Sequence, residues 1–123
     1  MFYEIRGVKQ LPGEPYRRWF QADEMDLTVW LAEATVVGFQ LSYDRFHDEK
    51  SIVWQTDRGF SHLRIDDGEQ ESGHYKASPI VTGHLPLDFS RALHRLEEDN
   101  QGIDPSIVGF VLDKLREGHQ PME

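Results

Sequence analysis

The first half of the chain alternates between hydrophobic and polar residues, with the period of two that a half-buried β-strand shows. The alternation is clearest over residues 25–31 and 35–43, where every second side chain is largely apolar. The predicted strands span residues 2–8, 16–22, 25–31, 35–43, 51–56 and 60–65. Tight turns at residues 23–24 and 57–59 join neighbouring strands, so the pattern predicts a mostly antiparallel β-meander of five or six strands.

The last third of the chain changes to helical spacing. Apolar residues recur every three or four positions over residues 86–99 and 104–118, which predicts two amphipathic helices. Asp104 is a suitable N-cap for the second helix, and Pro105 suits its first position. Each predicted helix has one apolar face, so the expected fold is α+β, with the two C-terminal helices packed on one face of the sheet.

The residues between the sheet and the helices are polar and glycine-punctuated, and we predict a loop over residues 66–85. Residues 80–82 are apolar enough to add a short strand within it. With 123 residues the chain has the length of a single domain, which we expect to cover residues 1–123.

Pairing the strands through their turns predicts one core face. Its members are Phe20, Leu27, Val29, Val37, Phe39, Leu41, Val53, Leu63 and Ile65. This face requires Phe39 to lie opposite Val53 across the loop of residues 44–49. A slip of one residue in that loop would send Ile52 and Trp54 to the core instead, because side chains alternate between the faces with a period of two.

The same register places a second set of residues on the opposite face of the sheet. This set, the predicted ligand-binding or interface residues, consists of Trp19, Trp30, Gln40, Trp54, His62 and Arg64. Tryptophan rings offer flat apolar surface, and the polar side chains among them would orient a ligand or a partner. Alternatively, the tryptophans belong to a core, inside a closed barrel or under a cover, or to a dimer interface.

A second hypothesis is a small enzyme or metal-dependent protein with a site around His62, Arg64 and Asp66, which share a face, completed by His74 or His84 from the loop. The signal is weak because Ser61 points to the other face and cannot partner the histidine as a nucleophile. The six histidines lack the spacing of a metal site, and neither a dinucleotide fingerprint nor a P-loop occurs. We therefore expect no metal and no cofactor.

The charge of the chain limits the classes of partner that it can bind. The net charge is −9 and the pI is near 5.0, so phosphate backbones and anionic membranes would repel it, and we expect neither nucleic-acid nor membrane binding. The absence of cysteine excludes disulfides and thiol chemistry. The first residues do not resemble a signal peptide, and no apolar run is long enough for a membrane span, which favours a cytoplasmic location.

Four motifs, RRWF at 17–20, DLTVW at 26–30, GFQLSYD at 38–44 and FSHLRIDDGE at 60–69, form a distinctive combination. Over about residues 16 to 69 the chain resembles a group of short hypothetical bacterial proteins of unknown function. The resemblance implies a bacterial origin and a small stand-alone domain, and it implies no activity. The predicted aromatic and polar face of the sheet instead leads us to expect a small non-enzymatic binding or interaction domain that forms a homodimer. A small-molecule ligand is the alternative partner for this face.

Overall fold

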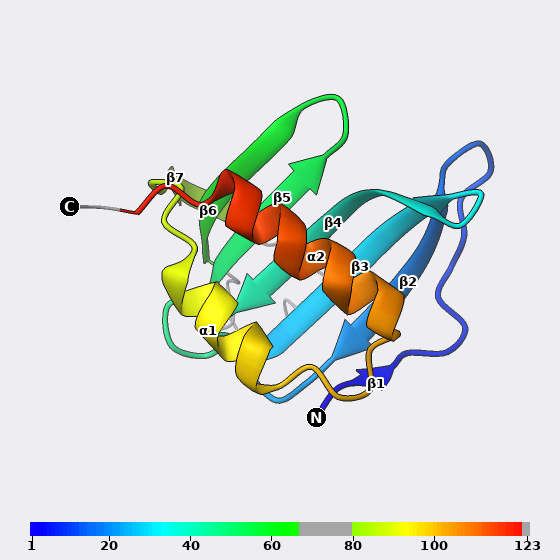
Figure 1. Cartoon of the computed structure of the whole chain (residues 1–123), viewed down its shortest axis with the longest axis horizontal. Helices are drawn as coiled ribbons and strands as arrows, with labels where there is room; N and C mark the ends of the chain where they lie inside the picture. The colour runs from blue at the N-terminus through cyan, green and yellow to red at the C-terminus, as the bar shows by residue number, and fades with distance from the viewer. Residues whose placement is uncertain (67–79, 122–123) are drawn as a thin grey trace.

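The fold is a seven-stranded antiparallel sheet with two helices on one side, seen in a computed structural model that describes residues 1–66 and 80–121 (Figure 1). The strands follow one another across the sheet in chain order, from β1 at one edge to β7 at the other. They are β1 (Tyr3–Glu4), β2 (Tyr16–Gln21), β3 (Met25–Ala32), β4 (Thr35–Tyr43), β5 (Lys50–Gln55), β6 (Gly59–Asp66) and β7 (Ile80–His84). The predicted α+β class and the meander are confirmed, and the sheet is not closed into a barrel.

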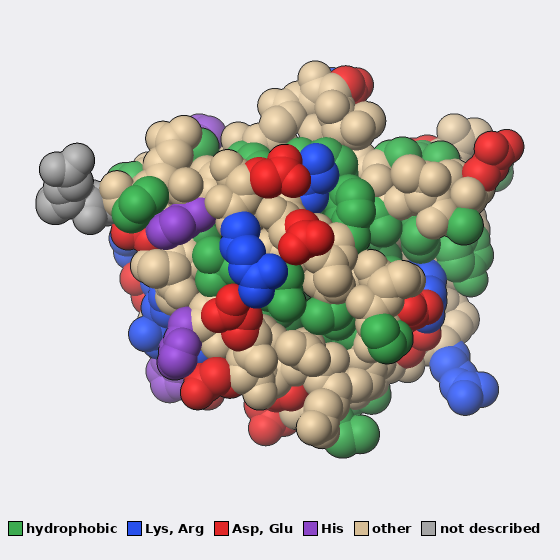
Figure 2. Space-filling model, in the orientation of Figure 1, with side chains coloured by type: hydrophobic (Ala, Val, Ile, Leu, Met, Phe, Trp, Pro, Cys, Tyr) green, Lys and Arg blue, Asp and Glu red, His purple; other side chains and the backbone are tan. Residues whose placement is uncertain are grey.

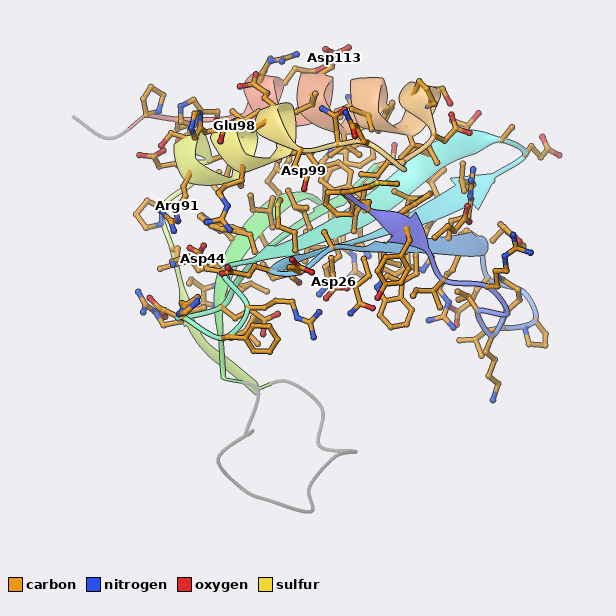
Figure 3. All side chains as sticks on the ribbon, turned by 90° about the horizontal axis from the view of Figure 1, so that it is seen from below. Asp26, Asp44, Arg91, Glu98, Asp99 and Asp113 are labelled. Carbon is orange, nitrogen blue, oxygen red and sulfur yellow. The ribbon has the colours of Figure 1, made fainter. Side chains whose placement is uncertain are left out.

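Helices α1 (Ser90–Glu98) and α2 (Pro105–Gly118) form a layer over one face of the sheet, and no described helix lies on the other face (Figure 3). The predicted start of α2 is confirmed: the Asp104 side chain accepts a hydrogen bond from the Ser106 amide at 3.0 Å, and Pro105 is the first helical residue. Neither helix in the described part of the chain has the length and apolar character of a membrane span.

Several predicted boundaries were too generous. The first strand was expected over residues 2–8 but consists of Tyr3–Glu4 alone, because Gly7 adopts a left-handed conformation (φ 71°) that turns the chain away. The first helix begins at Ser90 rather than near Pro86, since the Asp88 side chain accepts the Ser90 amide and so fixes the turn before the helix.

The register of the first hairpins follows the prediction. Trp19 lies opposite Thr28, and Trp30 lies opposite Arg17 on β2 and Gly38 on β4. One difference arises from a β-bulge between Trp30 and Leu31, which pairs Leu31 with Val36 instead of Val37.

The predicted register between β4 and β5 is wrong by one residue. Phe39 pairs with Trp54 rather than Val53, and Tyr43 pairs with Lys50, which leaves residues 44–49 in the connecting loop. The slip turns Ile52 and Trp54 toward the helices, where they are 0% and 8% exposed. It is favoured physically because it buries an isoleucine and a tryptophan in the core in place of the smaller valine.

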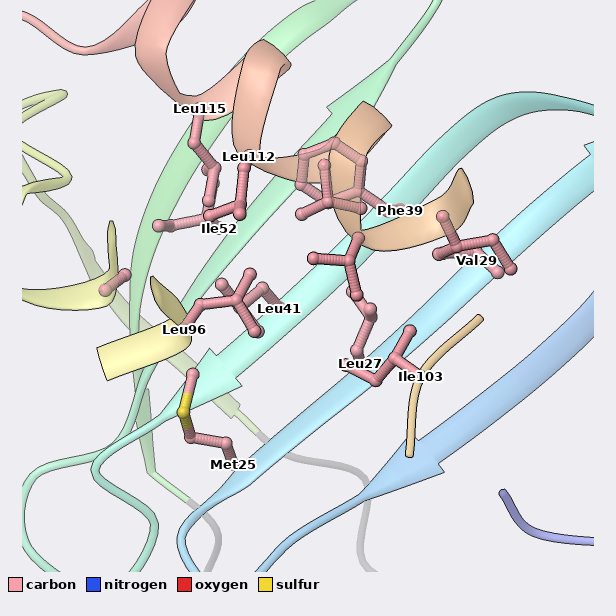
Figure 4. Close-up of a cluster of buried hydrophobic side chains, with 14 of the residues drawn as sticks. Met25, Leu27, Val29, Phe39, Leu41, Ile52, Leu96, Ile103, Leu112 and Leu115 are labelled. Carbon is pink, nitrogen blue, oxygen red and sulfur yellow. The ribbon is translucent and has the colours of Figure 1, made fainter. Parts of the chain in front are cut away.

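The core therefore differs from the predicted one in β4, β5 and β6. The residues expected there that are only partly buried are Val37, Val53, Leu63 and Ile65. The residues that were correctly predicted are almost fully buried: Phe20, Leu27, Val29, Phe39 and Leu41. Figure 4 shows Leu27, Val29, Phe39 and Leu41 in one cluster with Leu96 of α1 and Leu112 and Leu115 of α2.

Trp54 is the main aromatic contact between the sheet and α2. Its ring lies 5.8 Å from the Phe39 ring and 5.5 Å from the Phe110 ring of α2, and the Lys114 ammonium lies 5.1 Å from its centroid. Aromatic pairs at these distances add to the gain from burial. Trp54 therefore helps to hold the helix layer on the sheet.

Candidate binding surface

The face of the sheet that carries no described helix can be followed along rows of paired residues. One row runs Trp19, Thr28, Gln40, Val53 and Ser61, and the next runs Arg17, Trp30, Gly38, Gln55 and Gly59. We call these two rows the open face. Most of their side chains are partly or fully exposed, in contrast to the buried rows beneath the helices.

Only part of the predicted site lies on the open face. Trp19, Trp30 and Gln40 are together on it, each partly exposed. Trp54 and His62 are on the helix-bearing side, so the predicted three-tryptophan face is wrong. The same slip in the loop of residues 44–49 moved both of them, because His62 and Trp54 share a parity across the β5–β6 hairpin.

Arg64 lies at the end of β6, away from the tryptophans. Its guanidinium donates to both carboxylate oxygens of Asp48, at 2.7 and 2.9 Å. Asp66 ends the strand, and its side chain lies outside the described residues, as do His74 and most of the predicted loop. Arg64 therefore binds the loop that follows β4 and is not part of the open face.

A chain of polar and aromatic contacts extends the open face at one side. The Trp19 indole N–H donates to Asp26 Oδ1 at 2.8 Å, and Asp26 Oδ2 lies 3.4 Å from Arg45 Nη1. The Arg45 guanidinium in turn lies over the Phe46 ring, 5.3 Å from its centroid. Phe46 is 63% exposed, which makes it an aromatic side chain presented to solvent beside the open face.

The loop that carries Phe46 has an unusual backbone. Asp44, Phe46 and Asp48 all have positive φ angles, at 56°, 83° and 95°. Aspartate tolerates the left-handed region, whereas an aromatic residue there is strained. Strained residues collect at functional sites. The alternation signal missed Phe46 and Arg45 because both lie in a loop, and only their aromatic and cationic character marks them in the sequence.

Trp30 borders a hollow on the open face. The hollow has a volume of about 400 Å³, and its lining residues are Glu14, Pro15, Trp30, Val37, Gly38, Gln55, Thr56, Asp57 and Arg58. A side chain at Gly38 would meet the Trp54 carbonyl oxygen at 3.1 Å and the Trp30 ring at 3.8 Å. The glycine thus lets the indole lie close to the sheet and leaves its outer surface accessible.

An orphaned donor lies beside Trp30. The Arg17 Nε is buried and has no hydrogen-bond partner among the described residues, although the same guanidinium donates to the Lys9 carbonyl through Nη2 at 2.5 Å. Buried donors without partners are rare in native structures and need a specific explanation. This one adds to the signs that the open face is not simply a solvated surface.

His62 is held within the core by both of its ring nitrogens. Nδ1 lies 2.7 Å from the Pro86 carbonyl oxygen, which can only accept, so Nδ1 carries the proton. The Tyr43 hydroxyl then donates to Nε2 at 2.7 Å. Burial, partly offset by the Pro86 hydrogen bond, lowers the pKa of His62 below its usual value, and burial together with the Asp44 charge raises the pKa of Tyr43.

We expect the neutral state of His62 to make folding stability depend on pH. The unfolded chain takes up the proton near pH 6.5, whereas the folded chain resists it, so the free energy of unfolding decreases as the pH falls from about 6.5 toward the lower folded-state pKa. His62→Gln should cost about 1–3 kcal/mol at pH 7, because it disrupts buried hydrogen bonds, and should remove this part of the pH dependence. Urea unfolding between pH 7 and 5 measures both effects.

His94→Gln is the matched control for this prediction. His94 lies on the outer surface of α1 with its side chain 71% exposed, and its Nε2 lies 3.3 Å from the Glu98 carboxylate. The control should leave stability at pH 7 and its pH dependence nearly unchanged. Equal pH profiles for His62→Gln and the wild type would contradict the assignment of His62 as a buried neutral histidine.

No set of three or more histidine, aspartate or glutamate side chains in residues 1–66 and 80–121 is arranged to hold a metal ion. The fold and the open face thus define a small α+β domain with an aromatic and polar surface on one side. Comparison of the chain with protein-family models, curated proteins and solved structures finds no match.

Proposed function

We propose that this chain is a small non-enzymatic binding domain that associates with a second copy of itself through the open face. The observation that carries the proposal is the grouping of Trp19 and Trp30 on the open face, with the exposed Phe46 joined to Trp19 through Arg45 and Asp26. Aromatic residues are enriched in interfaces and dominate their binding energy. Where two copies meet, each would cover the aromatic side chains of the other.

The local charge supports a like partner. The chain has a net charge of −9, so two copies repel one another over most of their surfaces. Near the tryptophans, however, the charges balance. Arg45 lies beside Asp26. Arg17 pairs with Trp30, and the hollow beside Trp30 adds Arg58 together with the carboxylates of Glu14 and Asp57. This region is less acidic than the chain as a whole, and it is therefore a favourable place for two acidic chains to touch.

The enzymatic alternative receives less support from the geometry. Both ring nitrogens of His62 are engaged within the core, and the side chain is 5% exposed. A general base must reach the proton that it removes, directly or through one water. His62 would first have to give up the Tyr43 or Pro86 contact before it could act on a substrate.

We expect the wild-type chain to dimerise in a concentration-dependent way and Phe46→Asn to weaken the dimer about tenfold or more, as loss of an aromatic interface residue does. Asparagine tolerates the left-handed backbone, so the monomer should lose little or no stability. Sedimentation equilibrium from about 1 µM to about 1 mM covers the affinities expected of such an interface. Added salt should strengthen association, because it screens the repulsion between the acidic chains.

Trp30→Ala should weaken the dimer as well, and His94→Ala, on the exposed surface of α1, should leave it unchanged. A wild-type chain that stays monomeric throughout the concentration range would refute self-association. Equal dimer affinities for Phe46→Asn and the wild type would instead place the interface elsewhere on the molecule.

A further inference from the structure

A second concave surface lies on the helix-bearing side of the sheet, and the inference drawn from it does not depend on the open face. It is an open pocket of about 760 Å³ between the β3–β4 hairpin and the start of α2. The helix crosses the sheet and begins at Pro105, so the ends of β2, β3 and β4 extend beyond it (Figure 1). Figure 2 shows hydrophobic side chains at the surface between α2 and the β3–β4 hairpin. The volume is in the range of small-molecule sites.

The floor of the pocket is apolar. Leu31 and Val36 come from the sheet, and Ile107 and Phe110 come from the first turns of α2. The bulge between Trp30 and Leu31 creates this floor, because it pairs Leu31 with Val36 on the helix side. Bulges often redirect side chains next to binding sites. The floor can therefore receive an aliphatic or aromatic group.

The rim of the pocket is acidic. Arg18 is the cation on this rim, and Glu4 binds it through two hydrogen bonds at 2.8 and 2.9 Å, with Asp104 Oδ2 at 3.4 Å. Glu33, at the hairpin tip, lines the pocket and forms no ion pair with any described residue. Glu33 and Asp104 against the Arg18 guanidinium give the pocket lining a net charge of −1. Glu4, which lies outside the lining, pairs with Arg18 and offsets its positive charge.

The start of α2 adds no donor that could bind an anion. Pro105 has no amide hydrogen, and the Ser106 amide donates to the Asp104 side chain. The Ile107 and Val108 amides both donate to the Asp104 carbonyl oxygen, at 2.9 and 3.0 Å. The usual anion-binding groups of a helix N-terminus are thus occupied within the chain. Carboxylate and carbonyl acceptors remain at the rim, and they favour a cation.

We propose that this pocket binds a small amphiphilic cation, an amine or guanidinium carried on an apolar body. The body would lie on Leu31, Val36 and Phe110, and the cation would lie at Glu33 beside Asp104. Tyr16, which is 58% exposed at the edge of the pocket, offers an aromatic ring to the same cation. An apolar floor with an acidic rim distinguishes this ligand class from lipids with phosphate groups and from carboxylic acids.

Three probes of one shape test the proposal: 4-phenylbutylamine, 4-phenylbutanol and 4-phenylbutyrate, titrated into the whole chain and followed by amide chemical shifts. We expect the amine to bind about tenfold tighter than the alcohol, from its ion pairs and a cation–π contact, and the carboxylate to bind most weakly. The shifts should concentrate on the β3–β4 hairpin and the first turns of α2.

Glu33→Gln should lower the affinity for the amine about threefold and leave the affinity for the alcohol unchanged, as expected for one exposed charge. Glu98→Gln, an equivalent change on the exposed surface of α1, should alter neither. Thr35→Trp should block the pocket and weaken both probes. Equal binding of the amine and the alcohol, or shifts spread over other elements, would overturn the proposal. Dimer affinity measured on the same variants separates this result from the fate of the open face.

Discussion

Gly102→Ala is expected to destabilise the chain by about 3–5 kcal/mol, a large part of the stability of a typical domain. A methyl group at Gly102 would lie 1.8 Å from the Phe2 carbonyl oxygen and 2.7 Å from its carbonyl carbon. The clash is with backbone rather than with a flexible side chain, and the φ angle of +96° is itself unfavourable for alanine. Phe2 cannot easily move, because its amide donates to Gln101 and its side chain is 1% exposed.

Gly109→Ala is the matched control. Gly109 lies within α2, where an added methyl group meets no atom within 4 Å, so the substitution should stabilise the chain by up to about 1 kcal/mol through helix propensity. Urea unfolding of both variants gives the two free energies. A small loss for Gly102→Ala would contradict the close approach of the N-terminal strand to the connection between the helices.

Asp44→Asn is expected to cost about 3 kcal/mol, because it removes the anion from a buried ionic cluster. The Asp44 side chain is 5% exposed, and it accepts hydrogen bonds from Arg91 at 2.6 and 3.0 Å and from Arg95 at 3.0 Å. Figure 3 shows Asp44 at the end of the sheet beside Arg91 of α1. The expected loss of stability is at the low end for buried pairs, because the Arg91 side chain is 61% exposed and can be solvated once its partner is removed.

Acid should remove the same contribution in the wild type. Burial alone would raise the pKa of Asp44, but the Arg91 hydrogen bond and the charges of Arg91, Lys50 and Arg95 outweigh it and lower the pKa below 3.8. The stabilisation is therefore complete above the unfolded-state value and is lost as the pH falls through the folded-state value. In Asp44→Asn this acid-dependent loss should be absent.

Asp48→Asn controls for the change from carboxylate to amide in a left-handed residue. Asp48 has a φ angle of 95°, and its bidentate partner Arg64 and its own side chain are each 45% exposed. Exposed ion pairs contribute little, so the control should cost less than about 1 kcal/mol. Similar losses for the two variants, measured by urea unfolding at pH 7, would contradict the special role of the buried carboxylate.

Local signals in the sequence were sufficient to predict the order of the strands and helices. The cap and proline at Asp104 and Pro105 mark the start of α2, and the tight turn at residues 23–24 sets the pairing of Trp19 with Thr28. Each of these features depends on contacts between residues close in the chain. Such contacts can be inferred from residue types alone.

The prediction of the candidate site depended on the loop after β4, whose conformation has no recognisable signal in the sequence. Three left-handed residues other than glycine, Asp44, Phe46 and Asp48, shape the turn after β4, and residue types do not reveal that conformation. Counting the loop one residue short exchanged the faces of Ile52 and Val53 and moved Trp54 to the wrong side. The β5–β6 hairpin pairs Trp54 with Phe60 and Ile52 with His62, so the same change of face applies to His62.

In the proposed dimer, Trp30 lies on a surface that a second copy covers, whereas Trp54 lies beneath α2. Acrylamide quenching of two single-tryptophan variants tests it most directly: one keeps Trp30 and the other keeps Trp54, with the remaining tryptophans changed to phenylalanine. We expect quenching of Trp30 to be strong in dilute solution and to fall as the dimer forms, and quenching of Trp54 to be weak at every concentration. Strong quenching of Trp54, or quenching of Trp30 that does not change with concentration, would contradict it.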